Sequence, residues 1–409
     1  MMNRSITPTR RFRRYGLVSL LNAFSLGLFV PVMSLMLLDK GLDLSTLAFT
    51  LGAYSLVVLI AEVPSGFASD KFGRKHCFIL AKTLSIIGMT LLVGKASLLR
   101  MVLALLSLAL SRACISGSFE ALCVDQYLEV YGKDRMSRIS MMLSLWDTIG
   151  LSVGALTSGA VVLLSRYLPQ GYGRYDANLL SSVAINILVL GLGLGWIQEN
   201  LNQATTHRAP FSITATFRTI GENRKLLPLF LSAGATGFLL CTVETYWQPR
   251  FLQVTENSTL VALIGVLAFL GFFGAMGGNL ITGRVLDRKP DHVSGWYVGS
   301  RLLLAATIGA LALAGGTVSY SLAYTAVYMA LGMANIAENV LTNRETASHV
   351  RASILSISSF SLQSGALVAS GVGGLLLRTT QGSINQVWMI AAAVVCLSVI
   401  PVVVSNCKQ

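Results

Sequence analysis

The chain has 409 residues, of which 54% are hydrophobic and only 12% are charged. Soluble domains carry about 25% charged residues, so this composition excludes an ordinary soluble fold and favours a membrane protein. The net charge of +13 does not require a nucleic-acid partner, because basic residues in membrane proteins mark the cytoplasmic loops.

Twelve apolar runs are each long enough to cross a bilayer, which takes roughly 20 apolar residues. Each run is expected to be a helix, because a helix satisfies all of its own backbone polar groups in lipid. The predicted spans are 15–38, 46–69, 76–94, 99–128, 139–164, 178–197, 226–249, 258–283, 294–314, 318–343, 352–377 and 385–405. The sequence therefore predicts an all-α membrane protein with 12 transmembrane helices.

The distribution of bases predicts the orientation of these spans. With an even number of spans both termini lie on one side, and that side holds 21 of the 31 bases, against 7 on the other side and 3 within spans. Both termini are therefore expected to be cytoplasmic. The longest connection, 198–225, separates an N-terminal bundle (1–197) from a C-terminal bundle (226–409), each with six helices.

The turn between the second and third spans has an unusual composition. It places two glycines, an acid and three bases in ten residues, namely Gly66, Asp70, Lys71, Gly73, Arg74 and Lys75. Gly66 is expected to let a neighbouring helix approach closely, and Gly73 to supply a permissive backbone at the turn.

A weaker copy of this turn lies 217 positions further on, with Gly283, Asp287 and Arg288 at the matching places. In the copy, Pro290, Asp291 and His292 stand where Gly73, Arg74 and Lys75 stand in the first turn. The two halves of the chain are therefore expected to be repeats. The second turn is expected to contribute less to function than the first.

The spacing of the first turn resembles the loop between helices 2 and 3 of the major facilitator superfamily of transporters. This resemblance implies two repeated six-helix bundles with a substrate site near the midplane between them. It also implies a gating role for the residues of both turns, and a latch between helices 2 and 11 for the first.

The resemblance further implies a monomeric secondary transporter, not an enzyme, in a bacterial cytoplasmic (inner) membrane. Similarity to compact bacterial efflux permeases favours proton-coupled export of a small organic solute, such as a drug or metabolite. An importer or uniporter of a sugar, siderophore or metabolite is the alternative. The fifth span lacks the proline of the drug antiporter motif, and Gly117 follows Arg112 by five residues instead of four.

Ionisable residues inside spans are the candidates for chemistry, because a charge in the bilayer is costly and usually faces a cavity or a partner. They are Glu62, Lys82, Arg112, Glu120, Asp147, Glu244, Arg301 and Glu338. Three of the four histidines lie in predicted loops and His76 lies at the cytoplasmic end of the third span, so a proton site has to be a carboxylate. Asp147 and Glu120 are the first choices and Glu244 the third. The alternative is that these acids only neutralise Arg112 or lie at wet helix ends.

Arg112, Glu120 and Asp147 can form one network if the fourth span is a continuous helix. The full set of candidates for the charge network or the substrate site is Arg112, Trp146, Tyr246, Trp247, Asn335, Glu338 and Gln363. The aromatic residues of this set either stack on an organic substrate or serve in packing.

Other chemistry has little support in the sequence. The six cysteines lack CxxC spacing, so neither a metal nor a cofactor is expected. No P-loop is present, so ATP does not drive the protein directly. A membrane enzyme or sensor is a remote alternative, because no histidine lies within the interior of a span and the chain has no HExxH or GxSxG motif.

Overall fold

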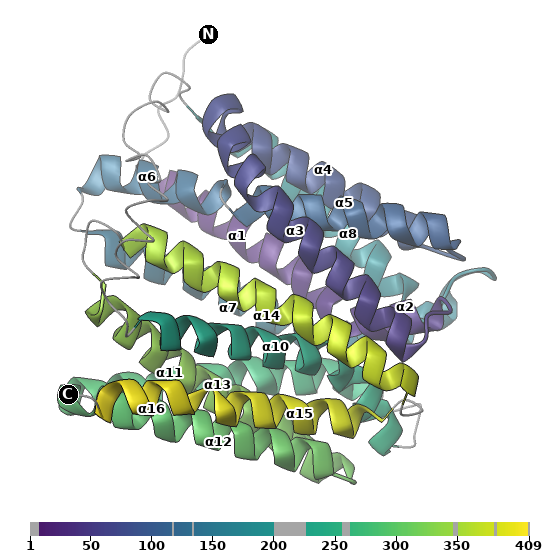
Figure 1. Cartoon of the computed structure of the whole chain (residues 1–409). Coiled ribbons are helices and arrows are strands. Elements are labelled where there is room, and N and C mark those ends of the chain that lie inside the picture. The colour runs from purple at the N-terminus through teal and green to yellow at the C-terminus, as the bar shows by residue number, and fades with distance from the viewer. Residues whose placement is uncertain are drawn as a thin grey trace. The chain divides into compact units, whose positions relative to one another are not determined.

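Helices make up all of the regular structure in the described part of the chain. The computed structural model describes residues 8–116, 118–132, 135–199, 226–255, 262–346, 351–379 and 383–407. The helices are α1 (Pro8–Phe29), α2 (Met33–Asp39), α3 (Leu44–Phe72), α4 (Arg74–Leu92), α5 (Leu98–Ser116), α6 (Phe119–Tyr131), α7 (Met136–Leu164), α8 (Asp176–Trp196), α10 (Leu226–Thr255), α11 (Leu263–Arg288), α12 (Val293–Leu313), α13 (Thr317–Arg344), α14 (Arg351–Thr379), α15 (Ile384–Leu397) and α16 (Val399–Cys407) (Figure 1).

Eleven helical segments among the described residues are long and apolar enough to cross a membrane. The tenth predicted span corresponds to α13, a helix of 28 residues whose tyrosines, asparagines and other polar residues lower its hydropathy. The all-helical membrane architecture predicted from the sequence is confirmed. The predicted linker 198–225 lies outside the described residues from position 200 onward.

The fourth predicted span corresponds to two described helices, α5, which ends at Ser116, and α6, which begins at Phe119. Together they form one stretch, Leu98–Tyr131, that is long and apolar enough to cross a membrane.

The glycine-rich turn at 66–75 is much shorter than its sequence suggests. Helix α3 continues to Phe72 and α4 begins at Arg74, so Gly73 alone separates them. Its φ of 97° lies in the region that favours glycine, which confirms the prediction for this residue. The prediction for Gly66 is wrong, because a Cβ built there meets no atom within 4 Å.

Contacts divide the chain into two compact units. Unit 1 comprises Met1–Gly41, Leu56–His207 and Val261–Val266, and unit 2 comprises Leu42–Ser55, Arg208–Leu260 and Leu267–Gln409. The start of α3 thus belongs to unit 2, where Ser45 Oγ donates a hydrogen bond of 2.8 Å to the carbonyl of Gly374 on α14. At this end of α3, the exposed Asp43 accepts a bond of 2.6 Å from the Thr46 N–H, which lowers the pKa of Asp43.

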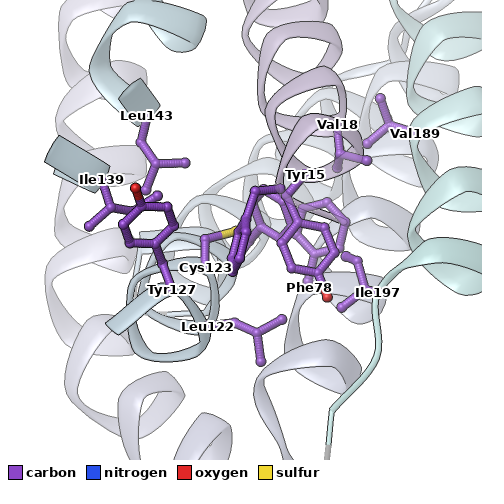
Figure 2. Close-up of a cluster of buried hydrophobic side chains, with 12 residues drawn as sticks. Tyr15, Val18, Phe78, Leu122, Cys123, Tyr127, Ile139, Leu143, Val189 and Ile197 are labelled. Carbon is purple, nitrogen blue, oxygen red and sulfur yellow. The ribbon is translucent and has the colours of Figure 1, made fainter. Parts of the chain in front are cut away.

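Unit 1 has an aromatic core at which α1, α4, α6, α7 and α8 meet (Figure 2). Phe12 on α1 packs edge-on against Tyr127 of α6 at a ring distance of 4.9 Å. Phe78 on α4 packs against Phe119 of α6 at 4.8 Å. This cluster packs the short helix α6 against α1, the first helix of the chain.

Glycines allow the long helices of each unit to touch through their backbones. In unit 1, a Cβ added to Gly150 or Gly154 of α7 would lie 2.2 Å or 2.3 Å from a carbonyl oxygen of α1. In unit 2, a Cβ added to Gly365 of α14 would lie 1.9 Å from the carbonyl oxygen of Gly234 on α10. Small residues at such crossings permit close helix packing.

Candidate functional site

Two exposed carboxylates come together in unit 1, Glu120 of α6 and Asp147 of α7. The two helices that carry them are in contact. Ser19 Oγ of α1 donates a hydrogen bond of 2.5 Å to Asp147 Oδ1. Glu120 lies in the first turn of α6, where the helix dipole favours an anion. Its place in the first turn of α6 therefore gives Glu120 part of its electrostatic environment.

Arg112 does not join this pair. It is exposed on α5, and it forms no hydrogen bond or ion pair with any residue that the structure describes. Arg112 lies on α5, whereas Glu120 lies on α6 and Asp147 on α7. Glu120 and Asp147 therefore lie on neighbouring helices, and Arg112 forms no ion pair with either of them.

Trp146 lies next to Asp147 on α7 and is half-buried. A Cβ added to Gly16 of α1 would lie only 2.6 Å from the indole Nε1 of Trp146. The glycine therefore makes room for the tryptophan ring against α1.

A second polar cluster in unit 1 surrounds a buried cation, Lys82, which the sequence shows only as an ionisable residue inside a span. Lys82 of α4 is 1% exposed, and its Nζ donates hydrogen bonds to Asn22 Oδ1 of α1 and to Asn186 Oδ1 of α8, the latter at 3.1 Å. Its Nζ also lies 5.9 Å from the ring centroid of Phe78. The two asparagines inside apolar spans were the sequence signal that could have located this cluster.

Unit 2 contains a similar buried cation, Arg301 of α12, which is 0% exposed. Its guanidinium donates to Thr236 Oγ1 and to the Ser232 carbonyl of α10, and to Ser398 Oγ at the end of α15. Its Nη1 also lies 3.6 Å from Glu338 Oε2 of α13. Glu338 is thus placed as a counter-charge inside the unit.

Lys82 and Arg301 occupy related places in the two halves of the sequence. They lie 219 positions apart, close to the offset of 217 between the two glycine turns. Each belongs to the third span of its half, and each binds polar groups of the first and sixth spans of that half. This agreement supports the repeat that the sequence analysis predicts.

Glu244 of α10 is exposed and accepts a hydrogen bond from the hydroxyl of Tyr328 on α13. A row of rings continues from there, with Tyr324 at 4.8 Å from Tyr328 and Trp247 at 4.8 Å from Tyr324. Trp247 and its neighbour Tyr246 are 2% and 1% exposed. In this structure the two rings are packing residues behind the carboxylate.

The remaining predicted substrate candidates are isolated from these clusters. Asn335 is half-buried on α13, and Gln363 is half-buried on α14. No hydrogen bond joins either side chain to another residue of the described part of the chain. Among the described residues there is also no group of three or more His, Cys, Asp or Glu side chains that could hold a metal ion.

The first glycine turn is held by groups that the sequence analysis did not select. The backbone N–H groups of Arg74 and Lys75 each donate 2.8 Å hydrogen bonds to the carboxylate of Glu199. The Arg74 guanidinium pairs with Asp125 of α6, and Lys75 Nζ donates to the Leu194 carbonyl of α8 at 3.0 Å. Glu199 therefore caps the start of α4, although it lies far from the turn in sequence.

The remaining residues of the two turns make few contacts with the described residues. Lys71 Nζ lies 5.3 Å from the ring centroid of its neighbour Phe72, and the side chain of Asp70 lies outside the described residues. In the second turn, Asp287 and Arg288 are exposed at the end of α11. A Cβ added to Gly283 meets no atom within 4 Å.

Long apolar helices in two units, with carboxylates exposed inside the spans, define a multi-pass membrane protein of the transporter type. A family description of the Major Facilitator Superfamily matches residues 15–370. The chain belongs to this superfamily.

Comparison with individual proteins agrees with this assignment. The chain is 26% identical over 265 residues to YxaM of Bacillus subtilis (strain 168), an uncharacterised MFS-type transporter, and the match spans 63% of this chain and 62% of that protein. The fold is similar to that of the nucleoside transporter NupG, with a TM-score of 0.80, 14% identity and coverage of 96% of this chain and 98% of NupG.

A POT family transporter in complex with 5-aminolevulinic acid is also similar, with a TM-score of 0.73, 11% identity and coverage of 98% and 96% of the two chains. At these identities the solved structures show the fold alone.

Proposed function

We propose that the protein exports a small organic solute, such as a drug or metabolite, from a bacterial cell in exchange for protons. In this proposal the two bundles, 1–197 and 226–409, alternate in opening the site, and residues 66–75 and 283–288 act at the gates. Asp147 and Glu120 carry the coupling proton. The observation that supports this assignment is the pair of neighbouring exposed carboxylates within the spans.

Two close carboxylates suit proton exchange because like charges disfavour double ionisation, so that one proton is readily shared or replaced by a cation. Ser19 gives the pair a donor that can stabilise the charged form of Asp147. Arg112 is not bound to the pair, so neutralisation by this base does not explain why two acids lie together. Glu244, which is held by Tyr328, is the third candidate.

The test is solute-driven proton movement in vesicles containing the purified protein. An inward-acidic gradient is imposed and followed with a pH-sensitive dye while fluorescent organic cations or nucleosides are added one at a time. We expect Asp147→Asn and Glu120→Gln each to abolish the collapse of the gradient that the transported compound produces. The exposed acid Asp291 is the control, and Asp291→Asn is expected to behave as the unchanged protein.

Two outcomes oppose the proposal at different levels. If both neutral variants still couple normally, the carboxylate pair is not the proton site. If the unchanged protein exchanges solute across the membrane at rates that do not depend on pH, the importer or uniporter alternative replaces proton-coupled export.

A further inference from the structure

A groove of about 520 Å³ opens in unit 2 around the start of α12. Its lining comes from α11, α12, α13 and the turn between α11 and α12, and consists of Val285, Lys289, His292, Gly295, Trp296, Gly299, Ser300, Leu303 and Met333. Most of these residues are apolar, and the two basic ones come from the turn. The groove is separate from Glu244, Arg301 and the other clusters described above.

The chain builds this groove with glycines on one helix face. Gly295 and Gly299 lie one turn apart on α12, and a Cβ added to either would meet no atom within 4 Å. Trp296 Nε1 donates a hydrogen bond of 2.9 Å to Thr282 Oγ1 of α11, which fixes the indole beside the opening. Leu303, at the far end, is 40% exposed, as expected for a surface in contact with lipid.

The bases at the turn are exposed. Neither Lys289 Nζ nor the imidazole of His292 forms a hydrogen bond or ion pair with any described residue, and the same holds for the side chains of Arg284 and Arg288. Two basic side chains therefore line one end of an apolar groove, and two more lie near them in sequence at the end of α11.

The first turn provides an internal comparison. There, Arg74 pairs with Asp125, and Lys75 binds the Leu194 carbonyl. In the second turn, Asp287 and Asp291 are exposed and form no ion pair with the neighbouring bases in the part of the chain that is described. The bases of the second turn thus make no such contact with the described residues.

We infer that this groove binds one phospholipid with a negatively charged headgroup. Its phosphate lies between Lys289 and His292, and one acyl chain follows Gly295 and Gly299 toward Leu303. Basic sites next to membrane helices attract anionic lipids of the cytoplasmic leaflet, and the distribution of bases assigns this turn to that side. The helix from His292 to Leu303 rises roughly 16 Å, about half of a 30 Å hydrocarbon core, which suits a chain from one leaflet.

The experiment measures thermal unfolding of the full-length protein in neutral detergent with added phosphatidylglycerol, phosphatidylcholine of the same acyl chains, or inorganic phosphate. A lipid that binds only the folded protein raises the unfolding temperature. We expect phosphatidylglycerol to raise it by several degrees more than either other addition. The double variant Lys289→Gln/His292→Gln should respond equally to both lipids, and Gly299→Leu, which fills the groove, should lose the response to both.

Matched controls separate the groove from general effects. Gly309→Leu changes another α12 glycine with free space around it, and Arg344→Gln removes an exposed base of α13 outside the groove. Both are expected to respond as the unchanged protein does.

The inference is overturned if the two lipids act equally on the unchanged protein or if inorganic phosphate matches phosphatidylglycerol. It is also overturned if the charge variant keeps the preference; that variant alters only exposed, unpartnered side chains, so it tests the site even if Gly299→Leu fails to fold.

Discussion

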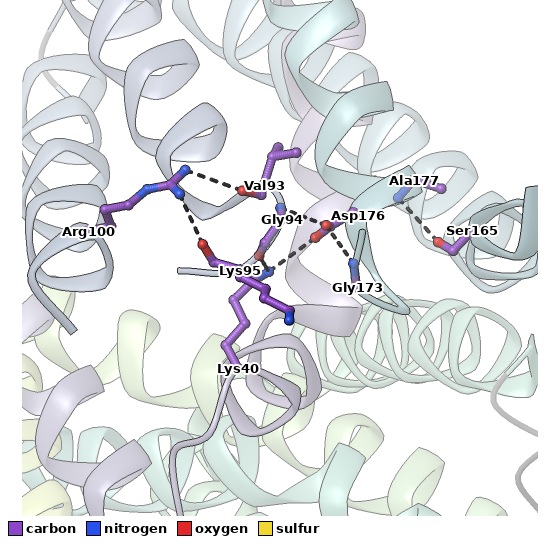
Figure 3. A network of polar contacts seen from close by, with 9 residues as sticks. All are labelled: Lys40, Val93, Gly94, Lys95, Arg100, Ser165, Gly173, Asp176 and Ala177. Atoms are coloured by element: carbon purple, nitrogen blue, oxygen red, sulfur yellow. Dashed lines mark hydrogen bonds and ion pairs between the residues drawn. The ribbon is translucent and has the colours of Figure 1, made fainter. Parts of the chain in front are cut away.

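Replacing Asp176 by alanine is expected to lower the free energy of unfolding by about 3–5 kcal/mol, the cost of leaving a buried charge without its partner. Asp176 is 0% exposed, and its Oδ1 lies 3.1 Å from Lys40 Nζ, whose side chain is itself only 4% exposed. Its Oδ2 accepts hydrogen bonds from the backbone N–H groups of Gly94 and Gly173, at 2.7 Å and 2.8 Å. The carboxylate of Asp176 thus holds together the loop after α2, the loop between α4 and α5, and the loop before α8 (Figure 3).

The loss is expected to exceed that of a surface acid because three donors lose their acceptor at once. Among the described residues Lys40 keeps the Gly94 carbonyl as an acceptor, at 2.8 Å, and the half-buried N–H groups of Gly94 and Gly173 lose theirs. The measurement is unfolding in detergent, followed by circular dichroism. Asp39→Ala removes an exposed acid close in sequence to Lys40 and serves as the control.

The variant Lys40→Met/Asp176→Asn tests the pairing itself. Because it removes both charges together, we expect it to lose less stability than Asp176→Ala. If Asp176→Ala unfolds at the same temperature as Asp39→Ala, the carboxylate does not hold these connections together.

The apolar pattern was enough to predict the helical membrane fold, because span length and backbone hydrogen bonding in lipid leave few alternatives. The role of Gly73 was predicted because a turn between two spans needs a permissive backbone. The predicted place of Arg112 beside Glu120 and Asp147 did not appear among the described contacts, because sequence spacing does not determine how neighbouring helices are rotated against one another.

The polar clusters were harder to predict than the spans. Asn22 and Asn186 are 164 residues apart in the sequence, and only packing of the first and sixth spans against α4 brings them to Lys82. Glu199 follows the last helix of its half, and nothing local indicates that it caps the start of α4. Sequence spacing predicts contacts within one helix, whereas these contacts depend on the register between helices.

Arg301→Met is expected to destabilise the protein by about 3–5 kcal/mol, because it leaves Glu338 as an uncompensated charge inside unit 2. The double variant Arg301→Met/Glu338→Gln should recover part of this loss, since both charges are then removed. Thermal unfolding of the two single variants and the double variant in the same detergent gives the coupling between the residues. If the single-variant losses add fully in the double variant, the ion pair at 3.6 Å contributes nothing to stability.

Lys82→Met provides the matched comparison in unit 1. Lys82 has two amide oxygens as hydrogen-bond acceptors and no carboxylate in contact among the described residues, so its removal strands no opposite charge. The expected cost is that of the two buried oxygens left without a donor, about 1–3 kcal/mol each, offset by no longer burying an ammonium group. We therefore expect Lys82→Met to destabilise less than Arg301→Met, although the two positions are related by the repeat. The opposite order would mean that Lys82 binds an acid, and would place a negative charge next to Asn22 and Asn186.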